Sequence, residues 1–463
     1  MARDLDGRSG GFGRRFGDLD RSLLLHCRTS QVTQAAETAG RAGGGLVVTA
    51  DRGNLRGCLG RARHLREVDH YRRPVLLDAA RYVGDARLPA AAPFDQRWID
   101  CQRDLGLPVL TDSGYLARDD TAGLAGILER AARLGDAIAL LPMHPSWLAD
   151  RIARQTLIRY VAAVGVPVAV VVEESANPFT PASTVPGLLQ LLGCGVPVLV
   201  LRADLPALGM LCSGATAVAI GTEPALRRLD PRRPARYRPP TGVPRPSVLV
   251  RQCLSYAPLA EIETTMRRYP DNGMWDCGCA TCAGRGLGWL VDRPDGERGR
   301  TAFRHSVDVL LDLRAELTGP SVQLNEWSWR ARCAAAASRR REVGWDLLPM
   351  LDHWQEAIAP PTTSRMPAPT SRRAGGSSRF SRATTPDRRP DQGRWALPPL
   401  ARFMPALTVR LFRSAHPKPG QRRVRRSPGI RPAPGAPLAR NQVRVGCAVR
   451  RVRPGPSGPT GWG

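Results

Sequence analysis

Short apolar runs, rich in β-branched residues, recur at regular intervals along the first 260 residues and constrain the fold more than any other feature. Stretches with helical signals separate several of them. Strands of this kind, apolar on both faces, are typical of a parallel sheet covered by helices. Eight strands are the number that closes a barrel. The eight candidate strands are 46–49, 75–78, 108–112, 138–141, 167–172, 197–201, 217–221 and 247–251.

The sequence therefore predicts an α/β fold, a TIM-like (β/α)8 barrel over residues 21–260. The alternative is an open doubly wound sheet, which usually carries a Gly-rich phosphate-binding loop after an early strand. Here Gly43-Gly44-Gly45 precedes its candidate strand, and the glycines of 284–288 follow no strand. We therefore favour the barrel over the open sheet.

Helix signals lie between the candidate strands. One helix is predicted to begin at Asp120 or Thr121 and to end at Gly135, and a longer one to run from Ser146 to Val164. The segment 292–300 has a loop-like composition. A helical pattern is expected from His305 onward, so that this histidine would open a helix.

Charge and composition change sharply near residue 359. The formal net charge is +27, but residues 361–463 contain 22 Lys and Arg against two Asp, which accounts for +20. This Pro-, Ser- and Arg-rich segment cannot offset the entropy of ordering. We expect 359–463 to be a disordered tail that is either a solvated extension or a non-specific contact for phosphate backbones. Residues 1–20 are expected to be flexible.

Three cysteines within six residues, Cys277, Cys279 and Cys282, are followed by His305 in the region 261–358. Thiolates and an imidazole are the ligands that tetrahedral zinc prefers. Uncommitted thiols or a disulfide are the alternatives. The cysteine count of 11 is odd and no secretory signal precedes them, which favours a reduced, cytoplasmic setting. The pattern predicts a closed, structural Zn²⁺ site in a C-terminal zinc-binding and helical subdomain.

Several carboxylates directly follow candidate strands, where the reacting groups of such barrels stand. They are Asp51, Asp78, Asp112, Glu173, Glu174 and Asp204. Carboxylates gathered at one rim suit glycosyl chemistry, in which one acts as nucleophile and another moves protons. For Asp204, which precedes Leu205-Pro206, the alternative of a helix N-cap is the better interpretation.

Two separated motifs resemble one known family. The segment Leu110-Thr111-Asp112-Ser113-Gly114-Tyr115 resembles the Leu-Thr-Asp-Ser-Gly-Gly-aromatic segment of tRNA-guanine transglycosylases. The three clustered cysteines with His305 resemble that family's zinc site. The order and separation of the motifs also match, over about residues 20–350.

The resemblance implies a barrel with a C-terminal zinc subdomain. In that family a carboxylate displaces guanine from a nucleotide, and a 7-deazaguanine base such as a queuosine precursor then takes its place. The position that matches Asp112 serves in proton transfer at the base. By resemblance Ser113, Gly114 and Tyr115 would bind the substrate, with Tyr115 as a stacking surface.

The chain also departs from the family pattern. One glycine is missing after Asp112, and Ala219 stands where the family's nucleophilic aspartate is expected. The family's Val-Gln-Gly-Gly stretch is absent, because Val172 is followed by two glutamates. We expect Asp204 or Glu173 to supply the nucleophile, with Glu173 otherwise contacting substrate.

Three hypotheses follow. The first is a divergent pentosyltransferase that exchanges guanine in a nucleic acid, tRNA in preference to DNA, for guanine or a deazaguanine base. The second is a catalytically silent relative that binds nucleic acid or pairs with an active subunit, as a homodimer or heterodimer. The third is an unrelated barrel hydrolase or lyase with a structural zinc. The longest apolar run, 164–172, falls short of the roughly 20 residues of a membrane span, so we expect a soluble protein with no membrane partner.

Overall fold

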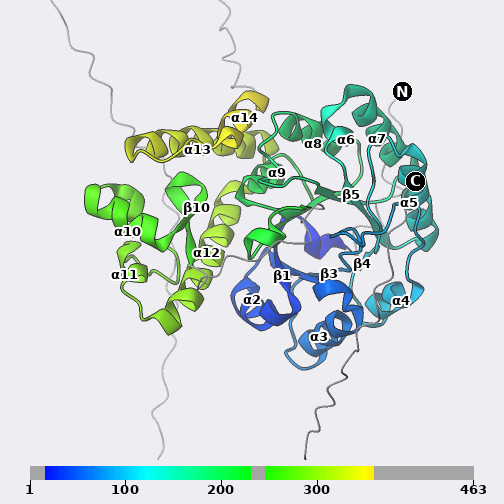
Figure 1. The fold of residues 1–463 in the computed structure, drawn as a ribbon, viewed down its shortest axis with the longest axis horizontal. Coiled ribbons are helices and arrows are strands. Elements are labelled where there is room, and N and C mark those ends of the chain that lie inside the picture. Colours follow the sequence, from blue (N-terminus) through cyan, green and yellow to red (C-terminus); the bar gives the residue numbers. More distant parts are fainter. Residues whose placement is uncertain (1–15, 231–245, 359–463) are drawn as a thin grey trace, which may run out of the picture. The chain divides into compact units, whose positions relative to one another are not determined.

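Eight parallel strands form a nearly closed, barrel-like sheet in the computed structural model of the chain (Figure 1). The structure describes residues 16–230 and 246–358. The strand order is β3-β2-β1-β8-β7-β6-β5-β4, and β3 and β4, at its two ends, are neighbours without a shared ladder. The strands are β1 (Ser22–Arg28), β2 (Gly44–Thr49), β3 (Val75–Asp78), β4 (Val109–Leu110), β5 (Ala137–Met143), β6 (Val168–Val172), β7 (Val198–Ala203) and β8 (Ala217–Gly221).

Helices follow each of the first seven strands. They are α2 (Val32–Ala39), α3 (Leu55–Glu67), α4 (Gln96–Asp104), α5 (Thr121–Leu134), α6 (Ser146–Ala149), α7 (Arg151–Val164), α8 (Thr184–Leu192) and α9 (Leu208–Cys212). Helix α5 has the predicted ends: Asp120 accepts from Gly123 N, and Gly135 adopts a left-handed φ of 75°. The helix predicted from Ser146 to Val164 is two helices, because Asp150 is extended and caps α7.

The mixed α/β, barrel-like fold confirms the fold prediction at this level, but one of the eight predicted strands was wrong. Residues 247–251 do not enter the barrel, since β9 (Ser247–Val250) pairs with β10 (Ser255–Pro258) in an antiparallel hairpin. The missing barrel strand is β1, which pairs with both β2 and β8. Its polar residues His26 and Arg28 interrupt the apolar pattern that marks the other strands.

The remaining helices are α10 (Leu259–Arg268), α11 (Gly288–Val291), α12 (Asp295–Leu317), α13 (Val322–Glu342) and α14 (Pro349–Ala357). Helix α12 packs against β1, α2 and α9, so it takes the place of the helix that would follow the eighth strand. The loop predicted for 292–300 was therefore wrong from residue 295 onward, and the prediction that His305 opens a helix was also wrong. Asp295 and Glu297 in the first turn favour an early helix start, and His305 lies well inside it.

Inward-facing side chains fill the barrel in two zones. Apolar residues of the strands, such as Leu24, Leu76 and Leu199, form a buried inner cluster. Because side chains alternate along a strand, the residues two positions further on also face inward. Two of these are the buried, polar His26 and Asp78. The interior is thus apolar at mid-barrel and polar at the carboxyl ends of its strands.

Parts of the domain prediction lie outside the described residues: most of the N-terminal segment, at 1–15, and the whole tail at 359–463. No helix in the ranges 16–230 and 246–358 is long and apolar enough to cross a membrane.

Candidate functional site

The side chains of Cys277, Cys279, Cys282 and His305 converge in a buried cluster, with their ligand atoms within 4.8 Å of one another. His305 Nδ1 lies 3.7, 3.5 and 3.1 Å from the three Sγ atoms, in sequence order. Two ligands about 2.0 and 2.3 Å from a tetrahedral ion lie roughly 3.5 Å apart. The cluster therefore has the donor set and the spacing to bind a metal ion.

Local structure aims these four ligands at one point. The Cys282 N–H donates to Cys279 Sγ at 3.4 Å, which folds the cysteine segment back on itself. On α12, His305 Nε2 lies 2.9 Å from the carbonyl oxygen of Leu249 in β9. Since a carbonyl only accepts, Nε2 carries the hydrogen and Nδ1 presents its lone pair to the sulfurs. Such a partner fixes the ring orientation of a metal-binding histidine.

A second set of contacts ties the cluster to the barrel. Asp308 Oδ2 accepts from Thr281 N at 2.9 Å and from Thr281 Oγ1 at 2.6 Å, within the cysteine segment. Its Oδ1 lies 3.4 Å from Arg41 Nη1, which precedes β2, and Arg41 also pairs with Asp312. The cysteine segment, α12 and the barrel are therefore joined by one chain of polar contacts.

The thiols of the cluster share protons. Hydrogen bonds with Cys279 and then Cys282 lower the pKa of Cys277 to about 3, while hydrogen bonding with Cys277 and Cys279 raises the pKa of Cys282. The lowered pKa of Cys277 and the raised pKa of Cys282 describe one thiolate that accepts hydrogen bonds from neighbouring thiols. A metal ion would displace those protons, since it binds the thiolate form.

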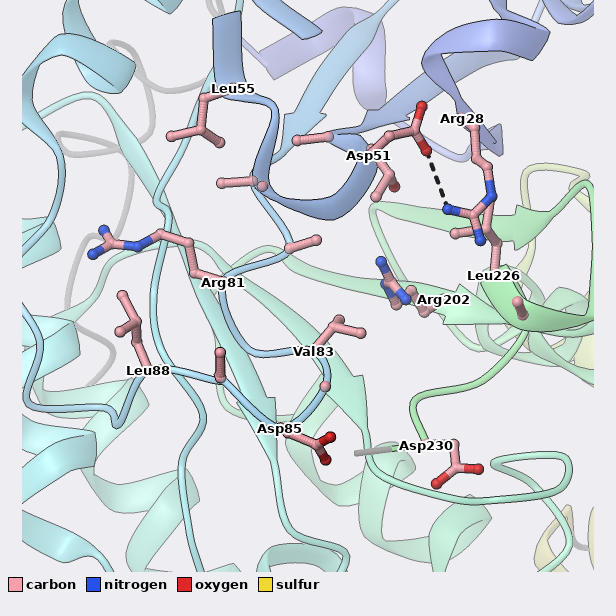
Figure 2. Close-up of a pocket in the computed structure, with 18 of the residues that line it drawn as sticks. Arg28, Asp51, Leu55, Arg81, Val83, Asp85, Leu88, Arg202, Leu226 and Asp230 are labelled. Carbon is pink, nitrogen blue, oxygen red and sulfur yellow. Dashed lines mark hydrogen bonds and ion pairs between the residues drawn. The ribbon is translucent and has the colours of Figure 1, made fainter. Parts of the chain in front are cut away.

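A separate cavity of about 940 Å³ opens at the carboxyl ends of β1, β2, β3 and β7 (Figure 2). Small apolar side chains and backbone form much of its wall. Its charged lining residues are Arg28, Asp51, Arg81, Asp85, Arg202, Arg228 and Asp230. This is the end of a parallel barrel where ligands bind. We call this cavity the barrel mouth.

Asp112 lies behind the barrel mouth. Its side chain is fully buried, pairs with Arg81, which lines the cavity, and accepts from Asp95 N at 3.0 Å. Burial raises the pKa of Asp112, against the opposing effects of the Asp95 N–H and of Arg81. A carboxyl group in this setting holds its proton more readily than an exposed one.

The residues after Asp112 pack inward and do not line the cavity. Ser113 Oγ is 2.9 Å from Thr111 Oγ1, and Gly114 lies so close to Pro89 O that a Cβ would meet it at 2.1 Å. The Tyr115 ring is buried beneath the Arg87 guanidinium, 3.8 Å from its centroid. The predicted stacking surface is thus covered by an arginine.

The two predicted nucleophiles, Asp204 and Glu173, also lie away from the mouth, whereas the strand-end residue Asp51 lines it. Asp204 caps the turn after β7, accepting from Leu205 N at 2.7 Å and from Asn177 Nδ2 at 3.4 Å. Glu173 follows β6, with its carboxylate 3.9 Å from Arg87 Nη1. Ala219 is fully buried in the inner cluster of the barrel. The structure does not bring Asp112, Asp204 and Glu173 together in the cavity.

Sequence reasoning missed a buried polar network beneath the mouth, of which only the strand-end residue Asp78 was singled out. Asp78 Oδ2 accepts from Tyr82 Oη at 2.9 Å and from Nε and Nη2 of Arg202 at 3.4 Å. His26 Nε2 lies 2.6 Å from Thr49 Oγ1 and 3.2 Å from Asp78 Oδ2. All five side chains of this mouth network are nearly or fully buried.

Arg202 reaches this network because β7 is irregular. Leu199 and Leu201 face the barrel interior, so regular alternation would point Arg202 outward. The register between β7 and β8 shifts between Val200 and Ala203, and Arg202 has a left-handed φ of 50°. Bulges of this kind re-aim side chains and are frequent beside functional sites.

Hydrogen bonding assigns charges within the network. Arg202 N–H donates to His26 Nδ1 at 3.3 Å, so the His26 hydrogen is on Nε2 and the ring is neutral. Burial lowers the pKa of His26, which agrees with this tautomer. Although burial opposes it, Arg202 and His26 hold the pKa of Asp78 well below its usual range. Asp78 and Arg202 therefore form a buried ion pair.

No protein-family model matches the chain, and no curated protein matches it.

Proposed function

We propose that this protein is a divergent, tRNA-guanine transglycosylase-like protein that receives one nucleotide of a nucleic acid in the barrel mouth. One observation carries the proposal: a Cys₃His cluster takes its histidine from α12, which packs against β1 of an eight-stranded barrel, and the mouth of that barrel is lined by arginines and aspartates. The resemblance of the Asp112 segment to the transglycosylases agrees with that arrangement. The bound metal in this proposal is zinc, held structurally, because four protein ligands leave no open position.

The barrel mouth suits a nucleotide in size and chemistry. Its volume of about 940 Å³ lies within the range of small-molecule sites, roughly 300–1,000 Å³. Guanidinium groups donate to guanine O6 and N7 or to phosphate, and carboxylates accept from the N–H groups of guanine. Four arginines and three aspartates line this cavity. A duplex substrate would have to flip its base out of the stack to enter it.

Binding without exchange is the form that the site supports best. Base exchange needs a carboxylate at the sugar, and the position of the family's nucleophile holds the buried Ala219. Asp204 has the contacts of an N-cap, and Glu173 lies beside Arg87. A silent protein of this type would act as a nucleic-acid-binding subunit, alone, as a homodimer or with an active partner.

Base exchange is the second candidate, and Asp51 favours it. Its carboxylate lines the mouth, held by Arg28 at 3.1 Å and by Thr29. In that reaction a carboxylate oxygen attacks the sugar C1′ as the bond to guanine N9 breaks, and guanine leaves with a proton. The incoming base then attacks C1′ through N9, releases the carboxylate and gives up its own proton. By the resemblance, Asp112, whose pKa is raised by burial, would donate the proton to the leaving guanine and take up the proton of the incoming base.

An exchange and binding assay tests both forms. Purified full-length protein is offered tRNA or DNA with labelled guanine, and label in the polymer and binding of the polymer are both measured. Binding without label incorporation supports the silent form, and incorporation abolished by Asp51→Asn supports exchange. If neither polymer binds while the protein is folded and carries its metal, the proposed function is wrong.

A further inference from the structure

The charged residues of the barrel mouth are unevenly placed. Figure 2 shows Arg28, Asp51 and Arg202 together in one part of the cavity, with Asp85 and Asp230 in another. The strand order explains the basic part, because β8 lies between β1 and β7. Arg28 ends β1, Arg202 lies in β7 and Arg228 follows β8, so three adjacent strands each supply one guanidinium.

Arg202 is the fixed member of this group. Its side chain is only 5% exposed, yet it lines the cavity. A guanidinium has five N–H donors, and Asp78 accepts from Nε and Nη2 only. The bulge in β7 and the left-handed backbone at this residue hold the group at the cavity floor. Part of its donor set is therefore left for a ligand in the mouth.

Arg28 and Arg228 are held by contacts that are fewer or more exposed than those of Arg202. Arg28 is oriented by Asp51 and by Glu223, and its Nη2 has no acceptor in the described part of the chain. Arg228 lines the cavity without a hydrogen bond or an ion pair to any residue within 16–230 or 246–358. Its charge is thus uncompensated by a direct partner among those residues.

We propose that Arg28, Arg202 and Arg228 form a phosphate subsite in the barrel mouth. The loops after strands 7 and 8 form the phosphate site of many barrels of this architecture. Arg228 follows β8, and Arg202 is the next-to-last residue of β7. Planar guanidinium groups bind phosphate oxygens in pairs of charge-assisted hydrogen bonds. The inference rests on the proposed function, which it extends by naming the group that anchors the nucleotide.

The acidic part of the cavity is placed to contact the base of a nucleotide whose phosphate is bound by the arginines. Figure 2 shows Asp85 and Asp230 apart from Arg28 and Arg202, so a nucleotide with its phosphate at the arginines would extend its base toward these two carboxylates. The N1–H and amino group of guanine are donors that a carboxylate accepts, whereas adenine presents an acceptor at N1. The mouth should therefore prefer guanine nucleotides to adenine nucleotides.

Calorimetric titration of the full-length protein with guanosine 5′-monophosphate, guanosine and adenosine 5′-monophosphate tests the subsite. We expect guanosine 5′-monophosphate to bind at least 10-fold more tightly than guanosine, because loss of hydrogen bonds to a charged group costs roughly that factor. Arg228→Gln should remove most of this advantage while leaving guanosine binding unchanged. Arg202→Lys, which keeps the charge near Asp78, should weaken only the phosphate-bearing ligand. Arg267→Gln, on the exposed face of α10, is the matched control.

The possible outcomes separate the subsite from the function. Equal affinity for guanosine and its monophosphate, or an advantage that survives Arg228→Gln, overturns the subsite and leaves nucleic-acid binding to be judged by its own assay. If the monophosphate binds but tRNA and DNA neither bind nor displace it, the phosphate subsite stands for a free nucleotide and the proposed nucleic-acid function fails. If the folded protein binds none of the three small ligands, the subsite is wrong.

Discussion

Within residues 16–230 and 246–358, two buried polar clusters are each built around a histidine in the Nε2–H tautomer, but the backbone fixes the two rings through different nitrogens. In the Cys₃His cluster, His305 Nε2 donates to the Leu249 carbonyl, so Nδ1 is free to bind an ion. In the mouth network, His26 Nδ1 accepts the Arg202 N–H, so Nε2 carries the hydrogen. Each tautomer is set by one backbone group, and the choice of group decides whether the histidine is a ligand or a hydrogen-bond bridge.

The clusters also differ in how their charge is balanced. The mouth network contains its own counter-ion, since Arg202 neutralises Asp78. Three thiolates in the other cluster would have no cationic partner of that kind and depend on a metal ion. The mouth network, whose charges balance internally, should therefore stay folded when a chelator removes metal, whereas the Cys₃His cluster should not.

Metal removal should give the largest difference in stability between the two clusters. A chelator, or Cys277→Ser, should unfold or loosen the region around 277–317, because structural zinc contributes roughly 10 kcal/mol of apparent binding free energy in small zinc domains. Metal content and thermal unfolding of the full chain measure the effect. The metal content should fall from one ion per chain to well below one. Cys253→Ser, at a buried cysteine outside the cluster, is the control and should retain the ion. A chain that melts at the same temperature with and without metal would contradict a structural role.

Breaking the internal ion pair should give the next largest effect. Arg202→Met leaves the Asp78 carboxylate buried without its main cationic partner, at a cost of about 3–5 kcal/mol in the free energy of unfolding. Asp78→Asn should cost a similar amount for the converse reason. The double variant should lose less than the sum of the two, because no lone charge remains buried. Urea unfolding of the four proteins measures this coupling, and strict additivity would mean that the pair does not interact.

The two clusters show what a sequence can and cannot predict. Three of four metal ligands lie within six residues, so their spacing alone indicated the site, and only the placement of His305 at a helix start was wrong. The mouth network joins residues from β1, β2, β3 and β7, and no local pattern links His26 to Arg202. Regular alternation would even have pointed Arg202 out of the barrel. The fold was predictable because it follows from repeated apolar strands, whereas β1, whose apolar run is interrupted by His26 and Arg28, was missed.

Acidification should weaken the mouth network at a defined pH. Because burial lowers the pKa of His26 in the folded protein, the unfolded chain takes up a proton near pH 6.5 that the folded chain refuses. Stability is therefore fully present above pH 6.5 and falls as the pH drops from there toward the lowered pKa, by at most about 1.4 kcal/mol per pH unit. The depressed pKa of Asp78 changes stability only below the ordinary pKa of an aspartate, 3.8, so the two effects are separable.

Unfolding free energies at pH 7.0, 6.0 and 5.0 test this assignment. His26→Gln should reduce the slope relative to the wild-type chain, because the buried titrating ring is removed. An unchanged slope in His26→Gln would mean that the ring titrates normally and is not locked as the Nε2–H tautomer.

The smallest expected effect concerns the hydroxyl that bridges the network. Thr49 Oγ1 accepts from His26 Nε2 at 2.6 Å and donates to Asp78 Oδ2 at 3.3 Å, so it joins the neutral ring to the ion pair. Thr49→Val keeps the shape but removes both bonds, and should cost about 1–2 kcal/mol in the free energy of unfolding. His26 Nε2 can still donate to Asp78, at 3.2 Å, so the network should be weakened rather than broken. Thr49→Ser, which retains the hydroxyl, should recover most of the loss. If Val and Ser variants are equally stable, the hydroxyl contributes nothing, and the ring is held by Asp78 and the Arg202 backbone alone.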